Sequence, residues 1–153
     1  MNLPSTELLG SSQIEIHYQR PHLQEMQHIS CAKDVDEILR TYINLKQLDL
    51  RECFWVILLT NANRVLAISE TAQGPSRCVL VNQKYIFQLA LLTNASAIIL
   101  AHNHPSGKLN FSKTDITETK KIQKLANLME ITLLDHIVIS SESFVSMAEE
   151  NEL

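Results

Sequence analysis

The sequence predicts a single α/β domain in which helices cover a mixed β-sheet. Amphipathic helical patterns alternate with short apolar runs, a helical pattern separates the last two of these runs, and a short polar turn joins two earlier ones. A helix between two strands implies parallel pairing, whereas a tight turn implies an antiparallel hairpin. With 153 residues, 45% of them hydrophobic, the chain is long enough to bury one ordinary core.

The start of the chain differs in pattern from the rest. Residues 1–30 carry no long helical pattern, and we expect them to form a loosely attached leader before a domain over residues 31–153. Within this leader, residues 13–19 alternate apolar and polar side chains, which predicts a short strand that ends at Pro21.

The first half of the domain has the pattern of a helix followed by a hairpin. Over residues 34–48, apolar side chains recur at i, i+3, i+4, i+7 and i+8, which predicts an amphipathic helix with one buried stripe. Residues 54–59 are a continuous apolar run too short for a typical helix, which predicts a central strand covered on both faces. A turn at residues 61–63 then leads to a second strand over residues 64–69.

The second half predicts two further pairs of helix and strand. Asn82 is a suitable N-cap for a helix that reaches residue 92 and is apolar nearly all round, so we expect it to be buried between layers. Residues 95–101 form an apolar run that predicts a strand. A helix over residues 113–129 and a last strand over residues 131–139 complete the domain.

Charge and cysteine content limit the classes of function. The net charge of -4 does not support a surface for duplex nucleic acid, and the lysines between residues 113 and 124 have the spacing of a solvent-facing helix side. A small basic patch beside the site is the alternative interpretation of these lysines, so nucleic acid stays open as a partner. Cys31, Cys53 and Cys78 form no C-x-x-C pair, which argues against a disulfide framework and favours a reducing cytoplasm. No signal-like start and no run approaching about 18 apolar residues is present, so we expect neither export nor a membrane span. The oligomeric state stays open.

Several common enzyme motifs are absent from the sequence. The only glycines are Gly10, Gly74 and Gly107, which excludes a G-x-G-x-x-G dinucleotide loop and a phosphate-binding P-loop. No H-E-x-x-H occurs, so a helix-borne zinc protease site is also excluded. Zinc deaminases need an H-x-E motif followed by P-C-x-x-C, but here His104 stands in place of the glutamate and no cysteine pair follows.

The most informative stretch runs from residue 101 to residue 115 and reads A-H-N-H-P-S-G-K-L-N-F-S-K-T-D. In an extended backbone His102 and His104 point the same way, and Pro105 keeps His104 extended. Asp115 adds a carboxylate. Two imidazoles and one carboxylate are a three-ligand set that leaves a fourth position for water, as in catalytic rather than structural zinc sites.

Ser112 and Asp115 also have a simpler explanation. Ser-x-x-Asp ahead of an amphipathic segment is a capping box, in which the serine caps the helix and the acid bonds back to it. Capping and metal binding are compatible, because a helix start is a rigid platform for a carboxylate. His136, beside Asp135 in an apolar strand, is more typical of a hydrogen-bonded core histidine than of a ligand.

Catalysis at such a site needs a base, and no acidic residue lies near His102 in the sequence. Glu52 is the preferred candidate, because it precedes the apolar strand of residues 54–59 and would be held at its entrance. Glu70 is the competing acid. A surface carboxylate at a strand end is the simpler interpretation of Glu52 from the residues alone.

These residues carry a resemblance to a known family. His102-x-His104, seven intervening residues and then Ser112-x-x-Asp115 resemble the motif of the JAB/MPN metalloprotease-like domains, and H-N-H-P-S-G resembles the RadC branch of that family. The stretches on either side of the motif also resemble that branch, as does a glutamate before an apolar strand: residues 94–101, residues 133–139 and Glu52-x-Phe54. The resemblance covers about residue 32 to the C-terminus.

The resemblance implies a cytidine-deaminase-like three-layer α/β/α fold and a bound zinc ion. It also implies that His102, His104 and Asp115 are the ligands, that Glu52 is the general acid/base, and that Ser112 steadies the oxyanion. The implied function is a zinc-dependent hydrolase of a peptide, isopeptide or related amide bond, acting through metal-activated water on a peptide or protein substrate.

The alternative function is a DNA- or protein-associated binding module whose metal site is structural or vestigial. Two departures from the RadC pattern bear on it. We expect no helix-hairpin-helix region of the kind usual in RadC proteins, and residues 74–85 differ from the usual stretch, with Asn-Gln-Lys at residues 82–84. These departures concern partner and substrate recognition rather than the metal site.

Overall fold

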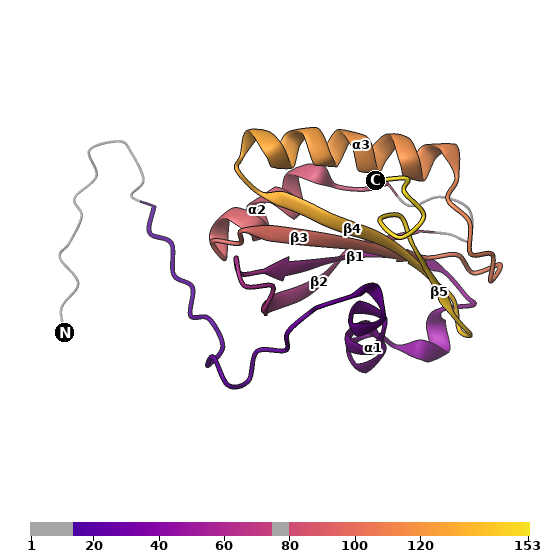
Figure 1. Ribbon diagram of the computed structural model, residues 1–153, viewed down its shortest axis with the longest axis horizontal. Helices are drawn as coiled ribbons and strands as arrows, with labels where there is room; N and C mark the ends of the chain where they lie inside the picture. Colours follow the sequence, from indigo (N-terminus) through magenta and orange to yellow (C-terminus); the bar gives the residue numbers. More distant parts are fainter. Residues whose placement is uncertain (1–13, 75–79) are drawn as a thin grey trace.

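The computed structural model describes residues 14–74 and 80–153, which form a mixed five-stranded sheet with α-helices on both faces (Figure 1). In chain order the elements are α1 Ala32–Tyr42, the 3-10 helix η1 Leu45–Gln47, β1 Glu52–Leu59, β2 Val65–Gly74, α2 Gln83–Leu92, β3 Ala97–Asn103, α3 Lys113–Leu128, β4 Thr132–Ile139 and β5 Phe144–Ser146.

The strand order in the sheet is β2-β1-β3-β4-β5. β1 pairs antiparallel with both β2 and β3, and β5 pairs antiparallel with β4. β3 and β4 pair in parallel, because α3 carries the chain back between them. The predicted hairpin and the parallel pairing across α3 are therefore confirmed, but the strands on either side of α2 are not paired, because β1 lies between β2 and β3.

Two apolar cores lie on the two faces of the sheet, which gives the three α/β/α layers (Figure 1). The core under α1 takes Trp55, Ile57 and Ile99, whereas the core under α2 and α3 takes Val56 and Leu100. Neighbouring residues of a strand enter opposite cores because side-chain direction alternates along it. The apolar run of β1 is thus buried on both faces, as predicted.

The predicted helix over residues 34–48 was wrong at both ends. α1 runs from Ala32 to Tyr42, and its C-cap residue Ile43 has an extended backbone with φ -85° and ψ 155°. Asn44 then caps the separate η1, because its side chain accepts the backbone N–H of Lys46. The apolar period continues across this break, so it could not reveal the change of direction.

α2 is not buried between layers, contrary to expectation. Only Ile86, Phe87 and Ala90 of this helix are buried, while the side chains of Leu91 and Leu92 are 59% and 45% exposed. Among the described residues no element covers its outer side, so its apolar composition exceeds what the sheet can bury.

The predicted strand in the leader was also wrong where it can be compared. Residues 14–19 form no strand, and Ile14 is 85% exposed, because no sheet edge lies against it. Residue 13 and Cys78 lie outside the described residues. Later in the leader, Met26 is buried in the core under α2 and α3, and His28 forms an isolated bridge with Arg64.

The strand limits also differ from the prediction in ways that matter for the site. β1 begins at Glu52, so this glutamate belongs to the strand instead of preceding it. β3 runs from Ala97 to Asn103 and therefore includes His102. β2 extends to Gly74, beyond the predicted residue 69, and the three-residue β5 was not predicted.

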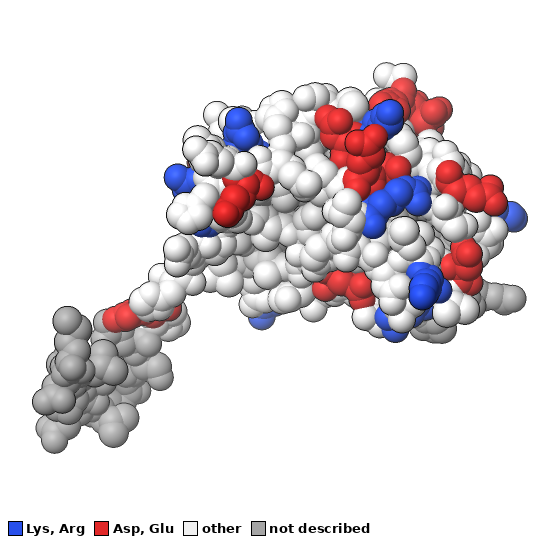
Figure 2. All heavy atoms as spheres, turned by 90° about the horizontal axis from the view of Figure 1, so that it is seen from below, with Lys and Arg blue, Asp and Glu red and all other residues white. Residues whose placement is uncertain are grey.

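The surface carries charges of both signs. On the α1 side, Lys and Arg side chains are interspersed with Asp and Glu side chains (Figure 2). Within the described ranges, no helix is long and apolar enough to span a membrane.

Candidate metal centre

The pairing of β1 with β3 brings Glu52 to the histidines. Phe54 lies opposite His102 in the antiparallel register. Glu52 is two residues before Phe54, so its side chain emerges on the same face of the sheet as that of His102. A sequence separation of about fifty residues is therefore closed by one strand pair, and the shared face is the one covered by α2 and α3.

The two histidines converge as the extended backbone predicts. Nε2 of His102 lies 3.0 Å from Nε2 of His104. After His104 the chain turns, with Gly107 at φ +76° donating its N–H to the His104 carbonyl. This turn returns the Lys108 carbonyl to within 2.9 Å of Nδ1 of His104. A carbonyl only accepts, so Nδ1 of His104 carries hydrogen and, in the neutral ring, Nε2 keeps its lone pair for the site.

Asp115 reaches the histidines from the first turn of α3. Ser112 and Asp115 form the predicted capping box: the Asp115 carboxylate accepts the Ser112 N–H at 2.7 Å, and Ser112 Oγ accepts the Asp115 N–H at 3.1 Å. The same carboxylate lies 3.5 Å from Nε2 of His102 and 3.7 Å from Nε2 of His104. Capping and contact with the histidines therefore coexist at one side chain.

The structure brings all five predicted site residues into one region. The donor atoms of Glu52, His102 and His104 all lie within 4.8 Å of one another, which makes them a group able to hold a metal ion. Asp115 contacts both imidazoles, and Ser112 joins the region through its capping bonds with Asp115. Two imidazole nitrogens and carboxylate oxygens are donors that suit zinc, so the residues fit the ion that the family resemblance implies.

Charge and burial have opposite net effects on the pKa values of the two carboxyl groups beside the histidines, Asp115 and Glu52. Burial opposes ionisation of Asp115, but the His102 and His104 imidazoles outweigh it and hold the pKa of Asp115 well below its usual range. The same Asp115 carboxylate raises the pKa of His104 against the effect of burial. For Glu52 the balance is opposite, because burial raises its pKa more than the two histidines lower it. Asp115 is therefore held as an anion, whereas Glu52 takes up a proton more readily.

Glu70, the competing acid, lies elsewhere. Its carboxylate accepts a hydrogen bond from Nε1 of Trp55 at 3.2 Å, and Trp55 belongs to the core under α1. Glu70 is therefore on the face of the sheet opposite to His102.

Two buried polar residues beside the site were missed as participants by sequence reasoning. His136 is a buried core histidine, as expected, but its Nε2 also lies 2.8 Å from Nδ1 of His102. Asn103, between the two histidines, is fully buried; it accepts the Cys53 N–H of β1 and donates to the Leu48 carbonyl before β1. A polar residue inside an apolar strand was the available signal in both cases, but its partner lies far away in sequence.

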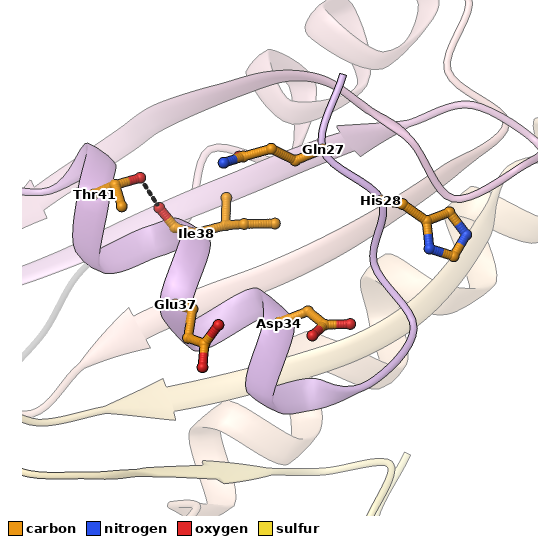
Figure 3. Close-up of a pocket in the computed structure, with 6 residues that line it drawn as sticks. All are labelled: Gln27, His28, Asp34, Glu37, Ile38 and Thr41. Carbon is orange, nitrogen blue, oxygen red and sulfur yellow. Dashed lines mark hydrogen bonds between the residues drawn. The ribbon is translucent and has the colours of Figure 1, made fainter. Parts of the chain in front are cut away.

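A separate hollow of about 400 Å³ lies beside α1 (Figure 3). Its acidic side chains do not converge on one point. The Asp34 carboxylate accepts hydrogen bonds from the backbone N–H groups of Ser30 and Cys31 at the start of α1. Thr41 Oγ1 in turn donates to the Ile38 carbonyl at 2.7 Å. The residues that line the hollow are Gln27, His28, Asp34, Glu37, Ile38 and Thr41.

Comparison with known proteins agrees with this architecture. The family model described as "RadC-like JAB domain" matches residues 29–153, which include every predicted site residue. The chain belongs to the RadC-like JAB domain family. It is 35% identical over 143 residues to the UPF0758 protein PM1152 of Pasteurella multocida, a match that covers 94% of this chain and 62% of the relative. It is 33% identical over 126 residues to a UPF0758 protein of Flavobacterium johnsoniae, covering 82% and 54% respectively.

A further UPF0758 protein, from Actinobacillus succinogenes, is 43% identical over 103 residues, with 67% of this chain and 47% of the relative covered. This RadC-like JAB domain chain thus spans about half to three fifths of the curated relatives it matches. The mixed sheet with three α-helices is consistent with the JAB/MPN domain.

Proposed function

We propose that this protein is a zinc-dependent hydrolase of a peptide, isopeptide or related amide bond, with water as the second substrate. The observation that carries the proposal is the convergence of two imidazole nitrogens and a carboxylate with a second, half-buried carboxylate beside them. The imidazoles of His102 and His104 and the carboxylate of Asp115 would hold the ion, and the half-buried carboxylate of Glu52 would move a proton.

His102, His104 and Asp115 are the proposed ligands. The donor atoms that lie within 4.8 Å of one another come from Glu52 and the two histidines, not from Asp115. The two carboxylates differ, however, in how readily they take up a proton. Asp115 is kept ionised by the imidazoles and oriented by the Ser112 N–H, both of which suit a permanent ligand. A bound zinc ion would lower the pKa of a water molecule toward about 7 and polarise the carbonyl under attack.

Glu52 is the proposed general acid/base. It lies at the first position of β1, half-buried and next to the histidines, and burial raises the pKa of its carboxyl group. A carboxylate with a raised pKa is better suited to take a proton from water and to deliver it to a leaving amine. The Glu52 role also follows from the family resemblance at Glu52-x-Phe54.

Ser112 is the proposed donor to the oxyanion. Its Oγ accepts the Asp115 N–H, and its hydroxyl hydrogen has no acceptor among the described residues. Ser112 is an exposed residue at the start of α3, and its capping bonds place it beside Asp115. Removing a comparable donor typically reduces turnover by about a hundredfold to a thousandfold.

The test separates metal binding from turnover. Zinc content is measured in wild type and in a variant with His102→Ala and His104→Ala, with His17→Ala and His22→Ala as a matched pair of exposed histidines outside the site. We expect about one zinc in wild type and in the exposed pair, and little in the site variant. Equal zinc in all three proteins would remove the metal site.

Hydrolysis is then screened with peptide, isopeptide and simple amide libraries. Cleavage by wild type that is lost in the site variant supports the hydrolase. Zinc binding without cleavage, together with salt-dependent DNA binding or stable capture of a protein partner, would replace it with the binding-module alternative.

A further inference from the structure

A chain of three hydrogen bonds runs from His102 back to α3. Nδ1 of His102 lies 2.8 Å from Nε2 of His136, and Nδ1 of His136 lies 2.6 Å from Oγ1 of Thr119. Oγ1 of Thr119 is also 2.6 Å from the backbone carbonyl of Asp115. The chain begins behind one proposed ligand and ends on the backbone of another.

The three side chains of this chain of hydrogen bonds are buried. His102, His136 and Thr119 are 1%, 2% and 2% exposed. Phe54 packs against both rings, stacked on His102 with centroids 6.0 Å apart and edge-on to His136 at 5.5 Å. The Asp135 carboxylate accepts a hydrogen bond from the His136 backbone N–H at 2.7 Å, which helps to fix the backbone of His136 in β4. Water cannot easily substitute for a missing partner in this chain, so each group depends on its neighbour.

Donors and acceptors along the chain are consistent with only one direction when Nε2 of His102 binds a metal ion. A neutral His102 that offers the Nε2 lone pair carries its hydrogen on Nδ1, so Nε2 of His136 must accept. The hydrogen of a neutral His136 is then on Nδ1, where only the Thr119 oxygen can accept it. Thr119 in turn donates its own hydrogen to the Asp115 carbonyl, which completes the chain.

We propose that His136 and Thr119 are positioning residues of the metal centre, which hold His102 in the tautomer and orientation that present Nε2 to the ion. This inference rests on the proposed metal site. A carboxylate or backbone carbonyl is the usual partner behind a metal-binding histidine. Here a second histidine fills that place, and a helix threonine fixes the hydrogen of the second histidine in turn.

Thr119→Val is the sharpest variant, because it keeps the shape of the side chain and removes the oxygen that accepts from His136. Thr117→Val is its matched control, since the exposed Thr117 makes the same kind of bond to the carbonyl four residues earlier, at 2.8 Å. Zinc affinity is measured by competition with a chromogenic chelator, and unfolding of the metal-free proteins is measured alongside. We expect Thr119→Val to raise the zinc Kd by about tenfold or more and Thr117→Val to leave it within about twofold.

A loss of metal-free stability in Thr119→Val without a change in zinc Kd relative to Thr117→Val would overturn the proposal, because Thr119 would then serve packing alone. A wild type that does not bind zinc would overturn both this inference and the proposed function. Wild-type zinc binding without hydrolysis leaves the inference standing and counts only against the proposed function.

Nitrogen-15 NMR of the zinc-loaded wild type tests the tautomers directly. We expect hydrogen on Nδ1 of both His102 and His136; hydrogen on Nε2 of His136 would contradict the proposed direction. His136→Leu should weaken zinc binding by roughly tenfold to a hundredfold, and His136→Gln should restore part of it, because an amide can accept from His102 and donate to Thr119.

Discussion

The side-chain oxygen of Asn103 accepts the backbone N–H of Cys53 at 2.8 Å, which ties the residue between the two histidines to the residue that follows Glu52. The Asn103 amide also donates to the carbonyls of Leu48 at 2.7 Å and Arg51 at 2.8 Å. One fully buried side chain thus closes the loop between η1 and β1 and holds the Glu52 backbone beside the end of β3.

Asn103→Ala is expected to lower the free energy of unfolding by about 2 to 4 kcal/mol, because it leaves one N–H and two carbonyls without their buried partner. Urea unfolding of the metal-free protein measures the change. Asn127→Ala is the control, since Asn127 is exposed near the end of α3 and should change stability by less than about 0.5 kcal/mol. Similar stability of the two variants would show that water satisfies the loop without Asn103.

Glu52→Gln is expected to retain zinc and lose at least about a hundredfold in hydrolysis, because the amide cannot take a proton from water. The control is Glu70→Gln, a change of the same kind on the opposite face of the sheet. Both are measured by metal analysis and by the rate on any substrate that wild type cleaves. Full activity of Glu52→Gln would reassign the base.

Removal of metal should destabilise the protein. At a free zinc concentration about a hundred times Kd, binding adds about 2.7 kcal/mol to the free energy of unfolding, and a chelator should reverse this. Thermal unfolding with zinc and with EDTA measures it, and the variant lacking His102 and His104 should respond to neither. A zinc response that survives in that variant would point to binding elsewhere.

Variants of Ser112 can separate capping from chemistry. Ser112→Ala should cost about 1 kcal/mol of stability through loss of the N-cap bond, whereas Ser112→Gly should cost only a few tenths. Both should reduce hydrolysis by about a hundredfold or more if the hydroxyl serves the oxyanion, while Ser112→Thr should keep cap and rate. A fully active Ser112→Gly would limit Ser112 to capping.

The metal-free protein should lose stability below about pH 6.5 because of His136. Burial holds the pKa of His136 well below 6.5, so the folded state keeps the ring neutral while the unfolded chain protonates it. The unfolded state then binds more protons below pH 6.5, and stability falls as pH drops, by at most about 1.4 kcal/mol per pH unit.

The measurement is the difference in unfolding free energy between wild type and His136→Gln, taken from pH 5 to pH 7 with EDTA present. The difference should grow in favour of wild type as pH rises to 6.5. His104 has a raised pKa, so its contribution to stability decreases as pH rises, opposite to that of His136. Because both proteins contain His104, its contribution cancels in the difference between them. His22→Gln, at an exposed position, should show no such trend. A difference that does not vary with pH would contradict the expected neutral His136.

Local pattern predicted the order of elements because periodicity reflects which side of a segment is buried. The strands β1 and β4 and the helix α3 were predicted within a few residues, since each buries one continuous face or run. The errors occurred where a local pattern has more than one tertiary outcome. The apolar stripe of residues 34–48 continues across the bend at Ile43, and the apolar outer side of α2 stays exposed.

The sequence by itself determined the local half of the candidate site. The His102-x-His104 spacing, the turn at Pro105 and Gly107, and the capping box of Ser112 and Asp115 all depend on neighbours within about fifteen residues. Only the tertiary structure decided the other half. The β1–β3 register selects Glu52 over Glu70, and α3 and β4 place Thr119 and His136 behind His102. Strand pairing and helix packing join residues that no local spacing relates, which is why these partners became visible only in the folded chain.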